Sequence, residues 1–264
     1  MKLEISDQLP QACNSQLSQS LGRRLYNIQQ GAKHYWLKVQ LVGFNPISEQ
    51  TFLNELTVYQ QLSQYNMKML LPFEILDSHR LFKAADSYLP TALLLQDAPA
   101  LFAQSPMHLS HDQILQILLQ SLDAVSHLHQ VGYLHGDLKP QHFRLHHKKC
   151  YLIDFEQTAL FQQLQPHHSA TPHYMAPELF HAEAKSIQSD IYALGIIWLE
   201  WLTQQRLREK SYLDWAYLHC QHLKVQLPAQ FFMLDALLTG MLHKIKSQRL
   251  ADIYEIKQRL TEFV

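Results

Sequence analysis

One segment, from His135 to Phe143, constrains this chain more than any other: His-Gly-Asp-Leu-Lys-Pro-Gln-His-Phe. It places a carboxylate, Asp137, and an ammonium group, Lys139, two residues apart on a stretch whose glycine and proline favour turns. An apolar run over residues 151–153 then ends at Asp154-Phe155, which is typical of a strand that delivers a carboxylate to a site. Two carboxylates and a lysine are the groups that phosphoryl transfer needs to orient a hydroxyl, hold Mg²⁺ and neutralise phosphate.

Composition sets the outer limits of the interpretation. The chain has 264 residues and 47% apolar content, enough for one large domain or two lobes with a sizeable core. Its 22 basic and 23 acidic residues give a formal charge of −1, which predicts no nucleic-acid partner and no attraction to anionic membranes. The longest apolar run, residues 191–199, is too short to span a bilayer, and the N-terminus has no signal core.

Cysteine usage indicates the compartment. The three cysteines are odd in number and widely spaced, at Cys13, Cys150 and Cys220. This pattern favours a reducing environment over a disulfide framework, so we expect a cytoplasmic protein. The 17 histidines include His146-His147 and His167-His168, but no carboxylate or cysteine accompanies them at matched spacing, which argues against a zinc site.

The first hundred residues predict a small antiparallel sheet and one helix. Residues 1–20 are rich in Gln and Ser, and we expect an irregular lead-in or a first edge strand there. Residues 25–44 predict a hairpin that turns at Gln30-Gly31 and puts Trp36 and Lys38 on one face. Short apolar runs over residues 69–97, broken by prolines, predict the remaining strands.

A helix is predicted over residues 48–64, with an apolar stripe at Phe52, Leu56 and Tyr59. Glu55 falls on that stripe, and a buried carboxylate needs a partner, for which Lys38 is the candidate. A second helix begins at a capping box formed by Ser110 and Gln113 and leads towards His135, with a broad apolar stripe along it. Residues 155–169 are polar and rich in Gln and His, which predicts a mobile segment.

Three further motifs follow in order along the chain. They are Ala-Thr-Pro-His-Tyr-Met-Ala-Pro-Glu at 170–178, Ser-Asp-Ile-Tyr-Ala-Leu-Gly at 189–195 and Gln-Arg-Leu at 248–250. Together with the segments around Asp137 and Asp154, they resemble the eukaryotic-like (Hanks-type) Ser/Thr protein kinases over roughly residues 20–264. The resemblance implies an α+β, two-lobed fold in one catalytic domain. The N-lobe, residues 1–97, would be an antiparallel sheet plus one helix, and the C-lobe, residues 98–264, mainly helical.

The resemblance also implies roles for the residues that bear charge. Asp137 would orient the attacking hydroxyl and Lys139 would stabilise the γ-phosphate of ATP. Lys38, positioned by Glu55, would bind the α- and β-phosphates. Asp154 would hold Mg²⁺.

Other implied roles concern adenine and the architecture of the C-lobe. The backbone of the segment containing Leu95 and Asp97 would hold the adenine edge, with Trp36 beside it. Asp190 would fix the catalytic loop by hydrogen bonds, and Arg249 would pair with Glu178.

Several positions depart from the family pattern. The Gly-rich loop is missing, since residues 21–26 contain one glycine, and an indole at Trp36 would narrow the nucleotide pocket. His142 stands where an Asn usually holds a second Mg²⁺, which predicts the loss of one ion or a preference for Mn²⁺. Glu156 replaces a glycine after Asp-Phe. Gly136 replaces an arginine, so switching through a phosphorylated Thr158, Ser169 or Thr171 is not expected.

We therefore expect an ATP-dependent Ser/Thr protein kinase that uses Mg²⁺ or Mn²⁺ and acts on a protein substrate. Two alternatives remain open. A pseudokinase scaffold or allosteric partner is favoured by Trp36, His142 and the missing glycines, because fold does not establish activity. A small-molecule phosphotransferase is favoured by Gly136 and Glu156, whereas the run at 170–178 favours protein substrates.

Overall fold

The computed structural model describes residues 11–65, 70–82, 87–163 and 170–262. The chain forms two compact units. Unit 1 comprises residues 1–98 together with 154–156, and unit 2 comprises residues 99–153 and 157–264. The division falls between Ala98 and Pro99, and the three residues that begin at Asp154 pack with the N-terminal unit although they lie far along the chain.

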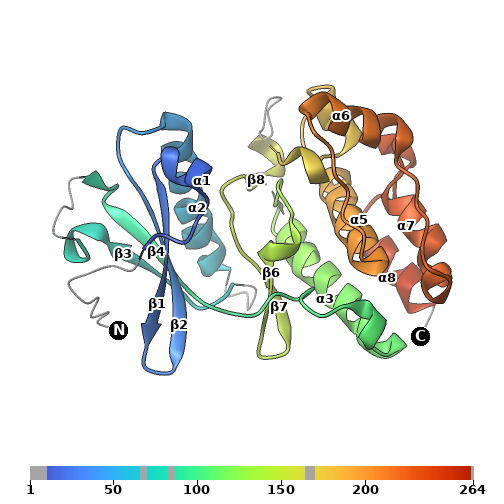
Figure 1. Ribbon diagram of the computed structural model, residues 1–264, viewed down its shortest axis with the longest axis horizontal. Helices are drawn as coiled ribbons and strands as arrows, with labels where there is room; N and C mark the ends of the chain where they lie inside the picture. Colours follow the sequence, from blue (N-terminus) through green and yellow to red (C-terminus); the bar gives the residue numbers. More distant parts are fainter. Residues whose placement is uncertain (1–10, 66–69, 83–86, 164–169, 263–264) are drawn as a thin grey trace. The chain divides into compact units, whose positions relative to one another are not determined.

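Unit 1 is built on a four-stranded antiparallel sheet with the strand order β1-β2-β4-β3 (Figure 1). The strands are β1 (Arg23–Gln30), β2 (Lys33–Gln40), β3 (Phe73–Asp77) and β4 (Thr91–Gln96). The predicted hairpin is confirmed, with Leu25 opposite Lys38 across its two strands. Alternate residues of β2, Tyr35, Leu37 and Val39, are buried, which leaves Trp36 and Lys38 on the other face of the sheet.

Two helices accompany this sheet. The long helix α2 (Pro46–Gln64) begins two residues before the predicted Ser48, because the Asn45 side chain accepts a hydrogen bond from the Ser48 N–H at 2.9 Å and proline suits the first turn. The short helix α1 (Gln16–Ser20) precedes β1. Of the described part of residues 1–20, residues 11–15 are irregular, as expected of a lead-in, and residues 16–20 form a capped helix where no helix was predicted.

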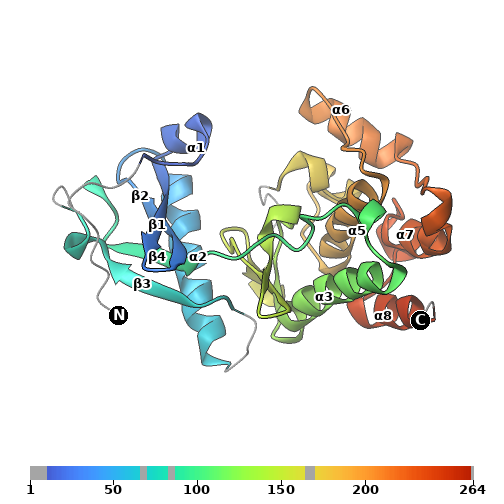
Figure 2. The ribbon, with the colours of Figure 1, turned by 60° about the horizontal axis from the view of Figure 1, so that its bottom comes forward.

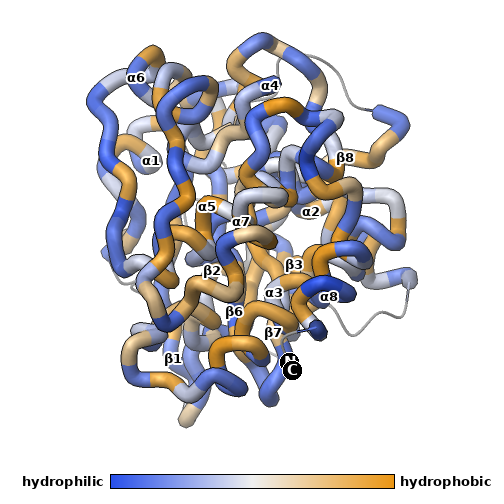
Figure 3. Tube along the Cα trace, turned by 90° about the vertical axis from the view of Figure 1, so that its right-hand side faces the viewer, coloured by the Kyte–Doolittle hydropathy of each residue, from blue (hydrophilic) through white to orange (hydrophobic). Residues whose placement is uncertain are grey.

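Unit 2 is mainly helical. Its helices are α3 (His111–Gln130), α4 (Pro177–Phe180), α5 (Ile187–Thr203), α6 (Tyr212–Tyr217), α7 (Asp235–Met241) and α8 (Ile253–Thr261). Helix α3 begins at the predicted capping box and packs along α8 (Figure 2). Helix α5 is buried along most of its length, and it also packs against α7. Hydrophobic residues, orange in Figure 3, recur along these helices and form the core of the unit.

Two small antiparallel ribbons carry the loops of unit 2. Strand β5 (Tyr133–Leu134) pairs with β8 (Ala159–Leu160), and β6 (Phe143–His146) pairs with β7 (Lys149–Leu152). The segment predicted to be mobile, residues 155–169, is ordered through β8 and a short turn to Gln163, and its remainder, residues 164–169, lies outside the described residues. None of the helices in the described part of the chain is long and apolar enough to cross a membrane. A sheet in the N-terminal unit and helices in the C-terminal unit confirm the α+β prediction.

Candidate active site

Lys38 is the centre of a charged cluster in unit 1. Its ammonium nitrogen lies 2.7 Å from a carboxylate oxygen of Glu55, 2.9 Å from one of Asp154 and 2.6 Å from one of Glu156. The Lys38 ammonium donates a hydrogen bond to Asp154, and the carboxylates of Glu55 and Glu156 share its positive charge as ion-pair partners. The predicted pairing of Lys38 with Glu55 is confirmed, and Asp154 joins the same cluster.

The cluster perturbs the ionisation of its members. Burial by itself lowers the pKa of Lys38, but the carboxylates of Asp154, Glu156 and Glu55 outweigh it and raise that pKa above its usual value. Burial raises the pKa of Glu55 to about 7, and the negative charges of Asp154 and Glu156 also raise it. The Lys38 ammonium has the opposite effect and lowers this pKa. Lys38 is therefore a permanent cation, whereas Glu55 is poised to take up a proton when its neighbours change.

Arg23, at the start of β1, is the second cation of the cluster. Its guanidinium contacts the Glu156 carboxylate, and it also donates to the side chain of Gln40 at 3.0 Å and to the backbone carbonyl of Ser48 at 3.0 Å. The same group lies 4.8 Å over the ring of Phe52. The exposed fraction of Arg23 is 7%, and its guanidinium forms an ion pair with Glu156.

Helix α2 holds the segment that carries Asp154. Glu55 accepts the Phe155 N–H at 3.3 Å, and the Phe155 ring packs edge-on against Tyr59 at 4.9 Å between centroids. Asn54 donates to the backbone carbonyl of Glu156 at 3.1 Å. Asp154 itself has a φ of 66°, a left-handed conformation that few residues other than glycine adopt. Packing and ion pairing together keep Asp154 in this conformation.

The residues predicted beside adenine lie together in unit 1. Trp36 stands opposite Leu95 in the β2–β4 ladder, and its indole N–H donates to the Asp97 carboxylate at 2.7 Å. The backbone N–H of Asp97 donates to the carbonyl of His34 at 2.8 Å, so this amide is already satisfied within the sheet. Contact of Trp36, Leu95 and Asp97 with adenine stays a prediction.

The catalytic loop of unit 2 carries the second charged group. The Asp137 carboxylate lies 2.8 Å from the Lys139 ammonium and accepts the backbone N–H of Thr171 at 3.0 Å. Burial tends to raise the pKa of Asp137, but the nearby Lys139 ammonium, helped by His142 and the Thr171 N–H, outweighs this and lowers it. Asp137 is therefore an anion at neutral pH, as an acceptor for a substrate hydroxyl must be.

Helix α5 fixes the backbone of this loop. The two oxygens of Asp190 accept the backbone N–H groups of His135 and Gly136, each at 2.9 Å, and one of them also meets His129 at 2.9 Å. The predicted role of Asp190 in holding the loop is confirmed. Burial, together with His142, lowers the pKa of His135 to about 4, so this imidazole is neutral inside the unit.

His142 lies in the catalytic loop of unit 2. Its ring is buried and stacks on His135 with 5.4 Å between centroids, in unit 2. Among the described residues, the carboxylates close enough together to share one ion are those of Glu55, Asp154 and Glu156, in unit 1. The structure therefore groups Asp154 with two glutamates, and the metal role of His142 stays a prediction.

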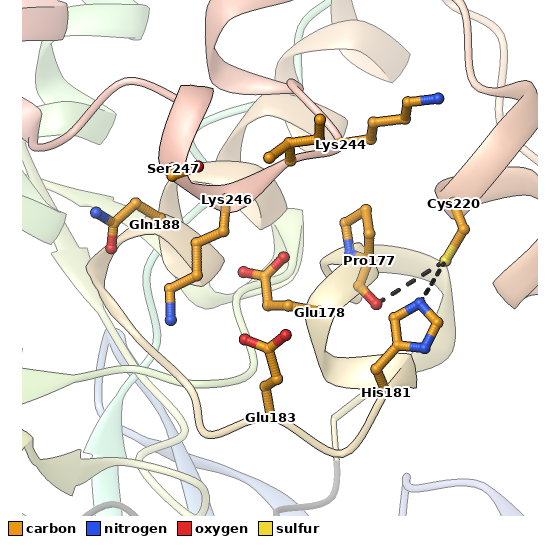
Figure 4. A pocket seen from close by; sticks show the side chains of 10 residues that line it. Pro177, Glu178, His181, Glu183, Gln188, Cys220, Lys244, Lys246 and Ser247 are labelled. Atoms are coloured by element: carbon orange, nitrogen blue, oxygen red, sulfur yellow. Dashed lines mark hydrogen bonds between the residues drawn. The ribbon is translucent and has the colours of Figure 1, made fainter.

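The run at 170–178 ends in a buried ion pair. The Glu178 carboxylate receives two hydrogen bonds from the Arg249 guanidinium, both at 2.8 Å, which confirms the predicted pairing. An open cavity of about 640 Å³ lies beside Glu178 (Figure 4). The Cys220 thiol borders it 4.0 Å from the His181 ring, but burial raises the pKa of that thiol, so this pair does not form a thiolate nucleophile.

Sequence reasoning missed the link between Arg23 and Glu156. The two residues are separated by 133 positions, and charged residues at such a distance give no periodic signal. It noticed Glu156 only as a departure from a glycine. The one available signal was that an added carboxylate close to Asp154 requires an added cation.

Comparison with known proteins agrees with this geometry. Residues 30–260 match the model of the protein kinase domain. Over 225 residues the chain is 26% identical to a protein of Acanthamoeba polyphaga mimivirus whose name assigns it provisionally to the serine/threonine-protein kinases, covering 82% of this chain and 80% of the relative. It is 34% identical over 106 residues to the serine/threonine-protein kinase PrkC of Bacillus subtilis and 34% identical over 101 residues to Nek9 of Mus musculus.

The last two matches cover only part of each protein: 38% of this chain and 16% of PrkC, and 36% of this chain and 10% of Nek9. The match to the domain model, by contrast, begins in the hairpin of unit 1 and reaches α8 at the end of unit 2. The chain therefore belongs to the protein kinase family, in its eukaryotic-like serine/threonine branch.

Proposed function

We propose that this protein transfers the γ-phosphate of ATP to a serine or threonine hydroxyl of a protein substrate. The observation that carries the proposal is the catalytic loop of unit 2, where Asp137 is an anion paired with Lys139 on a backbone that Asp190 fixes. A fixed carboxylate beside an ammonium group suits a reaction in which a hydroxyl is oriented while negative charge moves onto phosphate oxygens.

In this proposal each charged residue has one task. Asp137 accepts the hydrogen bond of the substrate hydroxyl and takes its proton as the reaction proceeds. Lys139 compensates the charge of the transferred group. In unit 1, Lys38 binds phosphate oxygens, and Glu55, which is 1% exposed, holds Lys38 in place.

The carboxylates of unit 1 fit a divalent cation. Oxygen atoms of Glu55, Asp154 and Glu156 lie within 4.8 Å of one another, and hard cations such as Mg²⁺ and Mn²⁺ prefer oxygen ligands. Asp154 is the most exposed of the three, at 33%, and is our candidate ligand. The bound ion would neutralise phosphate charge. The free cysteines further support a reducing, cytoplasmic location, and the balanced charge supports a protein rather than a nucleic-acid substrate.

A phosphotransfer assay with labelled ATP tests the proposal. The purified chain is supplied with Mg²⁺ or Mn²⁺ and a generic protein acceptor, beside Asp137→Asn, Asp154→Ala and a control, Asp123→Asn, which changes an exposed carboxylate of α3. We expect label on serine or threonine of the acceptor, a loss of about 100-fold or more in the first two variants, and no change in the control. Absence of transfer with both ions would refute the proposal.

A pseudokinase remains the second candidate, and one observation favours it. Three carboxylates surround the Lys38 ammonium, so a phosphate oxygen must compete with them for this residue. A thermal-shift measurement with ATP separates the two candidates when transfer is absent. A stable protein that shows no nucleotide-induced shift would be a scaffold.

A further inference from the structure

The ring of carboxylates around Lys38 raises a problem for any phosphate ligand. Lys38 is 13% exposed, and the carboxylates of Glu55, Asp154 and Glu156 all lie within ion-pair distance of its ammonium nitrogen. A phosphate oxygen can bind this ammonium only if one carboxylate gives up its place. Of the three, the one that moves must find another cation, because an unpaired charge in a partly buried site is costly.

Two of the carboxylates are poor candidates for movement. Glu55 is 1% exposed and also accepts the Phe155 N–H, so packing and this hydrogen bond hold its side chain in place. Asp154 has Lys38 as its ion-pair partner, and under the proposed function it is needed in place for the metal.

Glu156 already has a second cation in Arg23. Its carboxylate contacts Arg23 and lies 3.2 Å from the Thr51 hydroxyl, while its backbone carbonyl is held by Asn54. The side chain can therefore leave Lys38 without becoming unpaired and without movement of the main chain.

Arg23 is built to stay where it is. Its exposed fraction is 7%, and Gln40, the Ser48 carbonyl and the ring of Phe52 fix its guanidinium from three further directions. A fixed guanidinium offers Glu156 a permanent second site. Two cations, Arg23 and Lys38, thus share three carboxylates, which leaves a formal charge of −1 that opposes an anionic ligand.

We propose that Arg23 and Glu156 are positioning residues that control the access of nucleotide phosphate to Lys38. Glu156 occupies Lys38 when no nucleotide is bound, and it rests on Arg23 and Thr51 when Lys38 turns to phosphate. The inference rests on the proposed function, because it takes a nucleotide as the ligand of Lys38. It assigns a use to the carboxylate that stands where the family has a glycine.

The proposal predicts opposite effects for the two residues. Glu156→Gln removes the competing charge, so nucleotide should bind more tightly. Arg23→Met removes the second site of Glu156, which then stays on Lys38, so nucleotide should bind more weakly. In the double variant the competitor is gone, and the loss of Arg23 should no longer matter. A purely structural role for Arg23 predicts instead that the double variant binds as poorly as Arg23→Met.

The experiment measures the dissociation constant of ADP with Mg²⁺ by calorimetry for the full chain and its variants. We expect Glu156→Gln to bind about 3- to 10-fold more tightly, Arg23→Met about 10-fold more weakly, and the double variant within about 3-fold of Glu156→Gln. Arg24→Met is the matched control, since the Arg24 guanidinium donates to the backbone carbonyls of Gln19 and Arg23; it should bind like the wild type.

Unchanged or weaker binding by Glu156→Gln overturns the inference, even if Arg23→Met does not fold. The inference is also overturned if the double variant binds ADP as weakly as Arg23→Met, or if neither the wild type nor any variant binds ADP. These outcomes are separate from failure of the proposed function, which is judged by transfer and its dependence on Asp137. If the chain transfers phosphate but the variants do not have opposite effects on ADP binding, the proposed kinase reaction stands and the proposed role of Glu156 is wrong.

Discussion

At the scale of single residues, Gly136 shows why a departure from the family pattern is required here. Its φ is 74°, and a Cβ atom on it would lie 2.7 Å from the Gln157 carbonyl oxygen and 2.9 Å from the Lys185 ammonium. Lys185 is 3% exposed, and burial lowers its pKa to about 8 even though Asp137 and Asp190 oppose that shift. A buried lysine thus fills the space beside the loop, and a larger residue at 136 is excluded.

Replacing Gly136 by alanine should therefore destabilise unit 2 by more than backbone strain alone. Gly132 is the matched control, since its φ is 84° but the nearest atom to a Cβ there is 4.0 Å away. We expect Gly132→Ala to lower the free energy of unfolding by about 1–2 kcal/mol, and Gly136→Ala to lower it by at least about 1 kcal/mol more. Urea unfolding measures both. Equal losses in the free energy of unfolding of the two variants would mean that the residues around Gly136 move aside at no cost in stability.

At the scale of elements, α5 organises unit 2. Ser186 and Ser189 form a capping box at its start, and Asp190 in its first turn reaches the catalytic loop. Gly195 lets the helix approach its neighbours closely, because a Cβ there would lie 2.9 Å from Leu242. The helix is thus both the core of the unit and the support of Asp137, so its packing and the chemistry of the loop are coupled.

The ion pair between Glu178 of α4 and Arg249, just before α8, joins two other elements of this unit. Both side chains are nearly inaccessible, with exposed fractions of 4% and 0%. Arg249→Met should lower the free energy of unfolding by about 3–5 kcal/mol, because Glu178 is left buried and unpaired. The double variant with Glu178→Met should recover most of that loss. Chemical denaturation of the wild type and the two variants checks this, and a double variant as unstable as Arg249→Met would contradict it.

At the scale of the whole molecule, local patterns and long-range contacts were predictable to different degrees. The hairpin at Gly31, the capping box at Ser110 and the apolar stripe of α2 follow from periodicity and capping, and the structure confirms them. The pairs of Lys38 with Glu55 and of Arg249 with Glu178 join distant residues. The apolar stripe indicated that Glu55 needs a partner and the family resemblance supported Lys38, whereas the resemblance alone indicated the second pair. Neither periodicity nor the family resemblance indicated the contact of Arg23 with Glu156, because Glu156 stands at a position where this chain departs from the family pattern.

Histidine burial predicts how the molecule responds to acid. His219 is 2% exposed, and its Nδ1 lies 2.9 Å from the Tyr192 hydroxyl. Burial, together with His173, lowers the pKa of His219 from 6.5 to about 4. Between these values the unfolded chain binds a proton that the folded chain does not, so stability is full above pH 6.5 and falls as the pH drops towards 4.

This one group should reduce the free energy of unfolding by about 2 kcal/mol between pH 7 and pH 5. His219→Gln has no titrating group at this position. Between pH 7 and pH 5 its free energy of unfolding should therefore fall by about 2 kcal/mol less than that of the wild type, whatever its value at pH 7. The exposed His222→Gln is the control and should keep the acid dependence of the wild type. Urea unfolding at fixed ionic strength measures each slope. If His219→Gln and the wild type lose stability in parallel, the acid response arises elsewhere, and His219 accepts its proton in the folded protein as readily as in the unfolded chain.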